Sequence, residues 1–261
     1  MASQQESDDH RALSRRALRQ KLEGLQGAGV THLPKRQNTS AQRMPTADVP
    51  TAPPVKSAEA APIPRHPAAA RPPSQLVQLD LVRHEVTACV KCPHLAAART
   101  QTVFGAGNPR ARLCFIGEAP GADEDRLGEP FVGRAGQLLD KVIEACTLKR
   151  GDVYVLNVLK CRPPENRPPR PDEIANCRGY LERQLAILQP EYICCLGATA
   201  AQALLNTDES IGKLRGRFHK FDRATVLCTY HPSYLLRVPS AKRDVWEDMK
   251  VLMRAMGVEL A

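Results

Sequence analysis

Three side chains that could take part in a reaction lie at or near the ends of short apolar runs. Glu118 and His231 each follow such a run, and Asn157 lies near the end of another. A carboxylate can orient water or stabilise a cation, and an imidazole can donate a hydrogen bond to a developing anion. An amide offers a donor and an acceptor side by side. These residue types suit catalysis as well as binding.

The segment 117–139 is the most informative stretch of the sequence. It contains two prolines, five glycines and five acidic residues between an apolar run and a helical pattern. A long polar loop after a strand is where an α/β protein carries its functional groups. Within it, we expect Asp123 and Asp125 to be solvated loop charges.

The cysteines form a second constellation. Cys89 and Cys92 make a C-x2-C pair, and 15 residues lie between Cys161 and Cys177. Four thiolates can hold a zinc ion or an iron–sulfur cluster, and the spacing does not distinguish the two. The other five cysteines are predicted to pack as small hydrophobes: Cys114, Cys146, Cys194, Cys195 and Cys228.

Strand-like and helix-like runs alternate from residue 76 onward. The expected strands are 113–116, 153–158, 192–196 and 225–229, and the expected helices are 134–147, 172–188, 198–206 and 241–256. Alternation of this kind predicts a three-layer α/β/α fold around a central four-stranded parallel sheet. Its functional groups should gather at the carboxyl ends of the strands.

Composition divides the chain near residue 75. Residues 45–73 hold nine prolines, and residues 1–75 carry +5 of the net charge of +9. We expect a disordered, basic, Pro/Ala-rich N-terminal extension over 1–75 and a folded domain over 76–261. A short basic helix at 11–25 is an alternative within the extension, as a docking or DNA-tethering element.

The domain is only mildly basic, so a polyanionic partner would contact a local patch. No apolar run reaches the ~18 residues of a membrane helix. The N-terminus lacks the apolar core of a secretory signal. We therefore expect no membrane association and a reducing, cytoplasmic location.

Four motifs together give the sequence a specific resemblance. Segments 117–121 (GEAPG), 130–133 (PFVG), 157–161 (NVLKC) and 231–233 (HPS) resemble the family 4 uracil-DNA glycosylases, which contain an iron–sulfur cluster. The four cysteines of the second constellation match that family's cluster ligands in order and approximate spacing. The resemblance covers about residues 80–257.

The resemblance implies a monofunctional DNA repair enzyme. It would hydrolyse the N-glycosidic bond of deoxyuridine in single- or double-stranded DNA, release uracil and leave an abasic site, which starts base excision repair. The implied cofactor is one [4Fe–4S] cluster on Cys89, Cys92, Cys161 and Cys177. The implied partner is uracil-containing DNA, bound by a monomer. The N-terminal extension lies outside the resemblance, and we expect it to bind DNA or a repair or replication protein.

The resemblance also assigns roles at the site. Glu118 would activate water and stabilise the cationic sugar, and His231 would donate to uracil O2. Asn157 would read O4 and N3–H of the base, which cytosine presents in reverse. The remaining members of the implied uracil pocket are Gly117, Gly121, Glu124 and Phe131.

Two of these pocket residues have specific tasks under the resemblance. Phe131 would stack on the base, and Glu124 would crowd the C5 edge and exclude the methyl group of thymine. Purely structural roles remain as alternatives for this loop: Glu118 could cap loop amides, and Phe131 could anchor the loop.

The DNA contacts follow the histidine and the third cysteine. In the superfamily the loop after the histidine enters the minor groove, so Leu235 or Leu236 would be the wedge. Both leucines could instead pack beneath the final helix. The basic stretches 160–170 and 213–223 are further candidates. The predicted DNA contacts are Ser233, Leu235, Leu236, Arg237, Arg162 and Arg167.

Three other functions compete with this interpretation. A uracil-binding relative that traps DNA covalently would need a reactive histidine, and residues 160–170 contain none. A non-catalytic cluster protein or DNA-binding module would not need Glu118, Asn157 and His231 together. A zinc-containing nucleotide-processing enzyme is the third.

Overall fold

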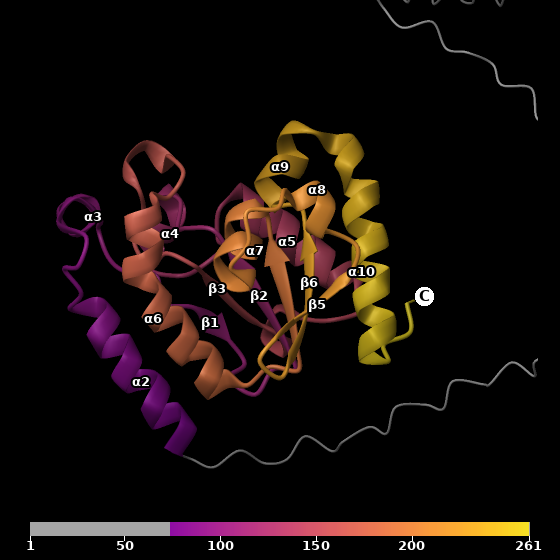
Figure 1. The fold of residues 1–261 in the computed structure, drawn as a ribbon, viewed down its shortest axis with the longest axis horizontal. Coiled ribbons are helices and arrows are strands. Elements are labelled where there is room, and N and C mark those ends of the chain that lie inside the picture. Colours follow the sequence, from indigo (N-terminus) through magenta and orange to yellow (C-terminus); the bar gives the residue numbers. More distant parts are fainter. Residues whose placement is uncertain (1–73, 261) are drawn as a thin grey trace, which may run out of the picture. The chain divides into compact units, whose positions relative to one another are not determined.

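The computed structural model of the protein describes residues 74–260, which form one α/β domain (Figure 1). The strands are β1 (Ala106–Gly107), β2 (Leu113–Gly117), β3 (Tyr154–Asn157), β4 (Tyr192–Leu196), β5 (Phe218–Phe221) and β6 (Ala224–Thr229). The helices are α2 (Ser74–Thr87), α3 (Pro93–Ala98), α4 (Ala122–Leu127), α5 (Arg134–Ala145), α6 (Pro171–Leu188), α7 (Ala198–Leu205), α8 (Ile211–Leu214), α9 (Pro232–Arg237) and α10 (Lys242–Met256). Short 3-10 turns lie at 150–152, 164–166 and 239–241.

The sheet has six strands in the order β1-β3-β2-β4-β6-β5. The inner four are parallel and are the four predicted strands. The prediction of a four-stranded sheet was wrong at the edges, where β1 and β5 add antiparallel strands. Neither edge strand has an apolar run: β1 is only two residues long, and β5 (FHKF) alternates exposed with half-buried side chains.

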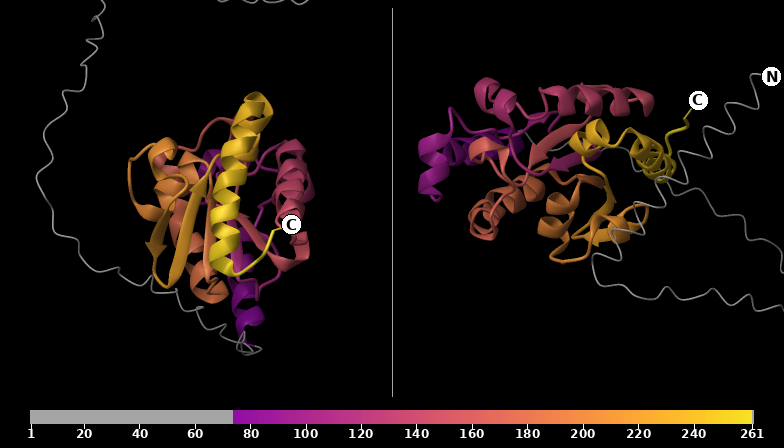
Figure 2. Two further views of the ribbon diagram at one scale, coloured as in Figure 1. Left: turned by 90° about the vertical axis from the view of Figure 1, so that its right-hand side faces the viewer. Right: turned by 90° about the horizontal axis from the view of Figure 1, so that it is seen from above.

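The inner strands are covered on both faces, which explains their continuous apolar sequences. Alternate side chains of the strands enter two separate clusters: Cys114 and Ile116 pack with α2, α6 and α7, whereas Leu113 and Phe115 pack with α5, α9 and α10. Figure 2 shows the sheet between these helical layers. The predicted three-layer α/β/α architecture is confirmed.

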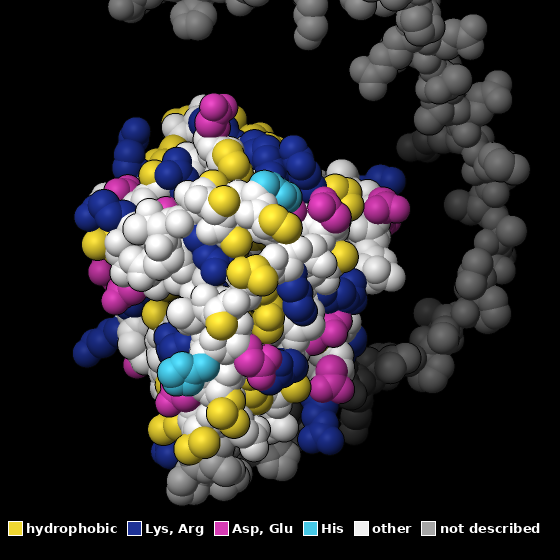
Figure 3. Space-filling view, turned by 90° about the vertical axis from the view of Figure 1, so that its left-hand side faces the viewer, with side chains coloured by type: hydrophobic (Ala, Val, Ile, Leu, Met, Phe, Trp, Pro, Cys, Tyr) yellow, Lys and Arg dark blue, Asp and Glu magenta, His cyan; other side chains and the backbone are white. Residues whose placement is uncertain are grey.

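The helix α2 has no counterpart among the predicted elements. It packs beside α6 through Leu79, Val82 and Val86 and leaves Leu76 and Leu81 more than half exposed. Apolar residues on both sides of a helix weaken its periodicity, which hid it in the sequence. Figure 3 looks onto this side of the domain, where hydrophobic and charged side chains are intermixed.

The five cysteines predicted to pack are all buried. Burial raises the pKa of Cys114 to about 12 and the pKa of Cys146 to about 11, so both stay protonated at neutral pH. Among the described helices, none is both long and apolar enough to cross a membrane. The expected N-terminal extension, including the possible helix at 11–25, lies outside the described residues, and the predicted division at residue 75 stays a prediction.

Candidate active site

A cavity of about 590 Å³ lies where the parallel strands end. This volume falls within the range of small-molecule sites. Its walls come from the turns after β2, β3, β4 and β6 and from the loop before α6. The lining residues predicted from the sequence are Glu118, Gly121, Glu124, Phe131, Asn157, Arg167, His231, Ser233 and Arg237.

Glu118 follows β2 and is half-buried in the cavity wall. Its Oε2 accepts a hydrogen bond of 2.5 Å from the hydroxyl of Thr199, at the start of α7. The backbone of Glu118 is also fixed, because its carbonyl accepts the Leu159 amide. No described backbone amide donates to the Glu118 carboxylate, which disfavours the alternative role as a cap for loop amides.

Asn157 is the last residue of β3 and is 2% exposed. Its backbone carbonyl accepts a 2.7 Å hydrogen bond from the buried Lys160 Nζ, while its side-chain Oδ1 is buried without a hydrogen-bond partner in the described structure. An unpaired buried acceptor is costly, so one on a residue that lines a cavity indicates a ligand that donates. Gly117 pairs with Asn157 across the strands, and a Cβ there would collide with Asn157 Oδ1 and with the Phe131 ring.

Phe131 is held in an unusual conformation beside this amide. Its φ is 56°, a left-handed value that costs a bulky residue roughly 1–2 kcal/mol, and its side chain is buried. Gly136 on α5 permits the conformation, because a Cβ at that position would collide with the Phe131 carbonyl. The Phe131 ring lies 5.6 Å from the His231 ring, centroid to centroid. Strain of this kind is common where a side chain must face a ligand.

His231 is the N-cap of α9, two residues after β6. Its Nδ1 accepts the Ser233 amide at 3.1 Å and lies 2.8 Å from Ser233 Oγ. Burial, aided by the charge of Arg237, lowers the pKa of His231 to about 4. The ring is therefore neutral at physiological pH and carries its proton on Nε2, which makes it a donor without charge.

Glu124 holds the long loop together. Its two carboxylate oxygens accept the amides of Gly121 at 3.0 Å and of Val132 and Gly133 at 2.9 Å. This bonding joins α4 to the segment that carries Phe131, and the carboxylate still lines the cavity. The loop therefore has a fixed shape.

The prediction that Asp123 and Asp125 are both solvated was half wrong. Asp123 is exposed, but Asp125 is 4% exposed and accepts the Thr100 amide with both oxygens, at 3.0 and 3.1 Å. The partner amide lies 25 residues earlier in the sequence, which explains why local composition gave no sign of it.

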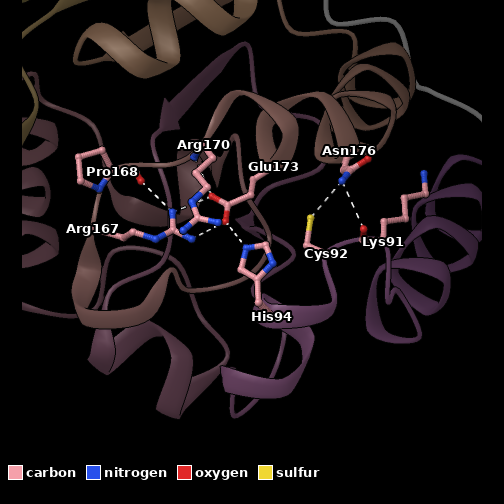
Figure 4. Close-up of polar contacts among 8 residues, drawn as sticks. All are labelled: Lys91, Cys92, His94, Arg167, Pro168, Arg170, Glu173 and Asn176. Atoms are coloured by element: carbon pink, nitrogen blue, oxygen red, sulfur yellow. Dashed lines mark hydrogen bonds and ion pairs between the residues drawn. The ribbon is translucent and has the colours of Figure 1, made fainter.

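The loop before α6 is tied to that helix by a buried carboxylate (Figure 4). Glu173 is fully buried and accepts two hydrogen bonds from Arg167, at 2.5 and 2.9 Å, and one from the Arg170 amide at 2.7 Å. His94 Nε2 on α3 lies 2.6 Å from the same carboxylate. The hydrogen bonds from Arg167 are the main cause that lowers the pKa of Glu173 to about 2.

The two predicted DNA-binding arginines of this loop both make hydrogen bonds within the protein. Arg167 lines the cavity but is engaged with Glu173, and Arg162 donates from Nε to Asn166 Oδ1 at 2.8 Å. Both arginines thus help to hold the shape of the loop.

The four predicted ligand cysteines come together from three segments. Cys92, Cys161 and Cys177 belong to one buried cluster, and Cys89 packs against it. Burial raises the pKa of Cys161 and of Cys177, and the neighbouring cysteines add to both shifts. Arg99 donates to Cys161 Sγ at 3.1 Å, and Asn176 donates to Cys92 Sγ at 3.4 Å. Within residues 74–260, no three side chains of Cys, His, Asp or Glu converge as around a single metal ion.

The two candidate wedge leucines on α9 differ in exposure. Leu235 is 2% exposed and belongs to the core beneath α5 and α10, so it cannot be the wedge in this conformation. Leu236 is 40% exposed and is followed by the exposed Arg237. The alternative of core packing therefore holds for Leu235 alone.

Two residues important to the site were not singled out from the sequence. Thr199 lies two residues after Gly197, which follows β4. This place near a strand end was the only sign in the sequence that Thr199 could belong to the site. Glu173 stands in the first turn of α6, where an acidic residue is normally explained by the helix dipole.

Comparison with known proteins identifies the family. A model of the uracil DNA glycosylase superfamily matches residues 104–250. The Type-4 uracil-DNA glycosylase of Archaeoglobus fulgidus is 41% identical over 187 residues, which cover 69% of this chain and 94% of that protein. The Type-4 uracil-DNA glycosylase of Thermotoga maritima is 44% identical over 176 residues, 66% of this chain and 91% of that protein. A Type-5 uracil-DNA glycosylase of Thermus thermophilus is 32% identical over 151 residues, 46% of this chain and 68% of that protein.

These matches confirm the resemblance to the family 4 uracil-DNA glycosylases that the four motifs indicated. The superfamily match includes the residues that line the cavity, from the loop after β2 to Arg237. The chain thus belongs to the uracil-DNA glycosylase superfamily.

Proposed function

We propose that the protein excises uracil from single- and double-stranded DNA by hydrolysis of the N-glycosidic bond and so starts base excision repair. The unpartnered Oδ1 of Asn157 carries this proposal. A base must supply an N–H donor to this oxygen and an acceptor to the neighbouring amide nitrogen. Uracil does so with N3–H and O4, whereas cytosine presents an unprotonated N3 and an amino donor. The mismatch leaves buried polar groups unpaired, which is a strong basis for rejection.

The base would enter the cavity after leaving the duplex stack. Phe131 supplies an aromatic face beside Asn157, and the missing Cβ of Gly117 lets both side chains pack against its backbone. Glu124, fixed by three amides, would stand at the C5 edge and exclude the methyl group of thymine. A rigid wall is needed for that task, because a single methyl group changes the binding energy too little to separate thymine from uracil by itself.

Bond cleavage would proceed through an oxocarbenium-like sugar and a uracil anion. As the bond between N1 and C1′ breaks, its electron pair moves into the base and charge develops on O2. The neutral Nε2–H of His231 would donate to that oxygen. Glu118 would stabilise the cationic sugar and accept a proton from the water that attacks C1′.

The four cysteines would hold one [4Fe–4S] cluster. Hydrogen bonds from Arg99 and Asn176 to two of the sulfurs suit a negatively charged thiolate-ligated group. The thiolates of Cys89, Cys92, Cys161 and Cys177 would be its four protein ligands. When bound, the cluster supplies a structural joint between the start of the domain, the end of β3 and α6. The loop before α6 would thereby be presented to DNA.

DNA contact is assigned to α9 and the loop before α6. Leu236 would fill the gap left by the extruded base, and Ser233 and Arg237 would contact the backbone or groove. Arg162 and Arg167 would contact phosphate with the donors that their intramolecular bonds leave free. The proposal also includes that the protein acts as a monomer in the cytoplasm and that its N-terminal extension binds DNA or a repair or replication protein.

The test is excision from oligonucleotides that carry a single uracil, thymine or cytosine, followed by alkali to cleave abasic sites. Substrate in excess of enzyme should be cleaved at uracil alone, in single- and double-stranded form. Stoichiometric trapping without turnover would favour the covalent relative. Failure to cleave by protein that shows the visible absorbance of an iron–sulfur cluster would refute the proposed activity.

A further inference from the structure

We propose that Thr199 is a positioning residue for Glu118, a role that rests on the proposed function of the cavity. Thr199 is the second residue of α7 and is half-buried in the cavity wall. Its hydroxyl donates to one oxygen of the Glu118 carboxylate at 2.5 Å. A short hydrogen bond to an ionised acceptor is among the stronger side-chain contacts.

The contact restricts a flexible side chain. Glutamate has several rotatable bonds, and ordering such a side chain costs up to about 2 kcal/mol. A carboxylate with one oxygen held by Thr199 Oγ1 keeps the other available to water and sugar. The order is present before substrate binds, so it favours a reactive arrangement.

The same turn also contacts both catalytic candidates. Gly197, at the end of β4, has φ 91° and donates its amide to the Thr229 carbonyl at 2.8 Å. A Cβ on Gly197 would lie 3.0 Å from the Cβ of His231, so the turn packs directly against the histidine. Gly197 thus touches His231 while Thr199 holds Glu118. The β4–α7 turn places both groups around one cavity.

Thr199→Val tests the role, because valine keeps the shape and removes the hydroxyl. We expect the single-turnover excision rate at saturating enzyme to fall about 10- to 30-fold. Affinity for uracil-containing DNA, from fluorescence anisotropy under conditions without turnover, should stay within about twofold, since the hydroxyl holds Glu118 rather than DNA. Thr199→Ser should restore the rate to within about threefold because it restores the donor. Thr207→Val, the same change near the other end of α7 and outside the cavity, is the matched control and should match the wild type.

A double-mutant cycle separates this role from a merely structural one. If Thr199 acts through Glu118, Thr199→Val should add little to the defect of Glu118→Gln. Equal effects of Thr199→Val in both backgrounds, or an unchanged rate in an active enzyme, would overturn the inference. Thr199→Ala serves in the cycle if the valine variant does not fold. An inactive wild type would instead refute the proposed function, so the two failures are distinguishable.

Discussion

The ends of β2, β3 and β6 make one wall of the cavity, and residues between 163 and 168 make a second wall. In the first wall, the Oδ1 of Asn157 and the Nε2–H of His231 have no hydrogen-bond partner among residues 74–260. In the second wall, the guanidinium of Arg167 is engaged by Glu173, and Asn166 accepts from Arg162. The polar groups of the first wall are therefore ready for a ligand, whereas those of the second wall hold the shape of the loop.

The contrast also separates two carboxylates of the same charge. Glu118 accepts a hydrogen bond from one hydroxyl and borders the cavity, whereas Glu173 is fully buried and accepts from a guanidinium and an amide. Enclosure by donors stabilises the ionised form and costs freedom to react. Glu118 is thus placed to react and Glu173 to hold the structure. Substitutions in the first wall should mainly affect activity, and those in the second wall should mainly affect stability.

The largest effect is expected from Asn157→Asp on the first wall. An ionised carboxylate accepts hydrogen bonds but donates none, so it loses the contact to uracil O4 and accepts from the amino group of cytosine. Excision of uracil should fall by about 10²- to 10³-fold, and the preference for uracil over cytosine should fall with it. The measurement is the single-turnover rate on matched oligonucleotides containing uracil or cytosine.

The matched control for this change is Asn206→Asp, which makes the same substitution at an exposed position after α7. It should leave both rates unchanged. An unaltered base preference in Asn157→Asp would show that the first wall does not read the base, and the comparison between the walls would fail at its main point.

The ends of the apolar runs were the part of the site that the sequence could predict. Glu118, Asn157 and His231 meet because parallel strands that are buried on both faces have clear apolar sequences and end at one edge. The hydrogen bond from Thr199 to Glu118 joins side chains 81 residues apart, and no local pattern records it. Contacts of this kind depend on tertiary geometry alone.

Adjacent residues on a short helix give a second limit to sequence reasoning. Leu235 and Leu236 are identical in type, and only the orientation of α9 against the core decides which one is exposed. The short edge strand β1, made of Ala106 and Gly107, also has no signal of its own, since it exists through pairing with β3. Elements held by their neighbours are the ones that the sequence does not reveal.

A smaller effect, on stability, is expected from Glu173→Gln in the second wall. The variant leaves Arg167 without its charged partner and places an amide among donors, which should lower the free energy of unfolding by about 2–3 kcal/mol. For a domain of this size the midpoint of thermal unfolding should drop by roughly 5–10 °C. Circular dichroism of the cluster-containing protein measures it.

The same variant should show a pH dependence of definite sign. Because the pKa of Glu173 is lowered to about 2 in the fold, its contribution is complete above the unfolded pKa and disappears as pH falls from about 5 toward 2. The gap in unfolding temperature between wild type and Glu173→Gln should therefore narrow over that range. Glu182→Gln, which removes an exposed partner of Arg178, should cost less than about 1 kcal/mol. Equal stability of the two variants would show that the second wall is not held by Glu173.

The smallest effect concerns the electrostatics of the first wall. Burial is the main cause that lowers the pKa of His231 to about 4, and the positive charge of Arg237 adds to it. Arg237→Gln should therefore raise that pKa, by less than about one unit, because the burial remains. Ring nitrogen chemical shifts of labelled histidine, followed by NMR from pH 3.5 to 8, report both the pKa and the tautomer. Arg254→Gln, which removes a charge from the far end of α10, should leave the pKa where it is.

This titration decides whether the histidine donates as a neutral ring. A lowered pKa means that the unfolded chain binds the proton more tightly, so acidification from about pH 6.5 to 4 should destabilise the fold through His231 while the folded ring stays neutral. A wild-type pKa above physiological pH would place an imidazolium against uracil O2, and a proton on Nδ1 would place the wrong tautomer there. Either result would remove the unused donor from the first wall and leave Asn157 as its only group held ready for the base.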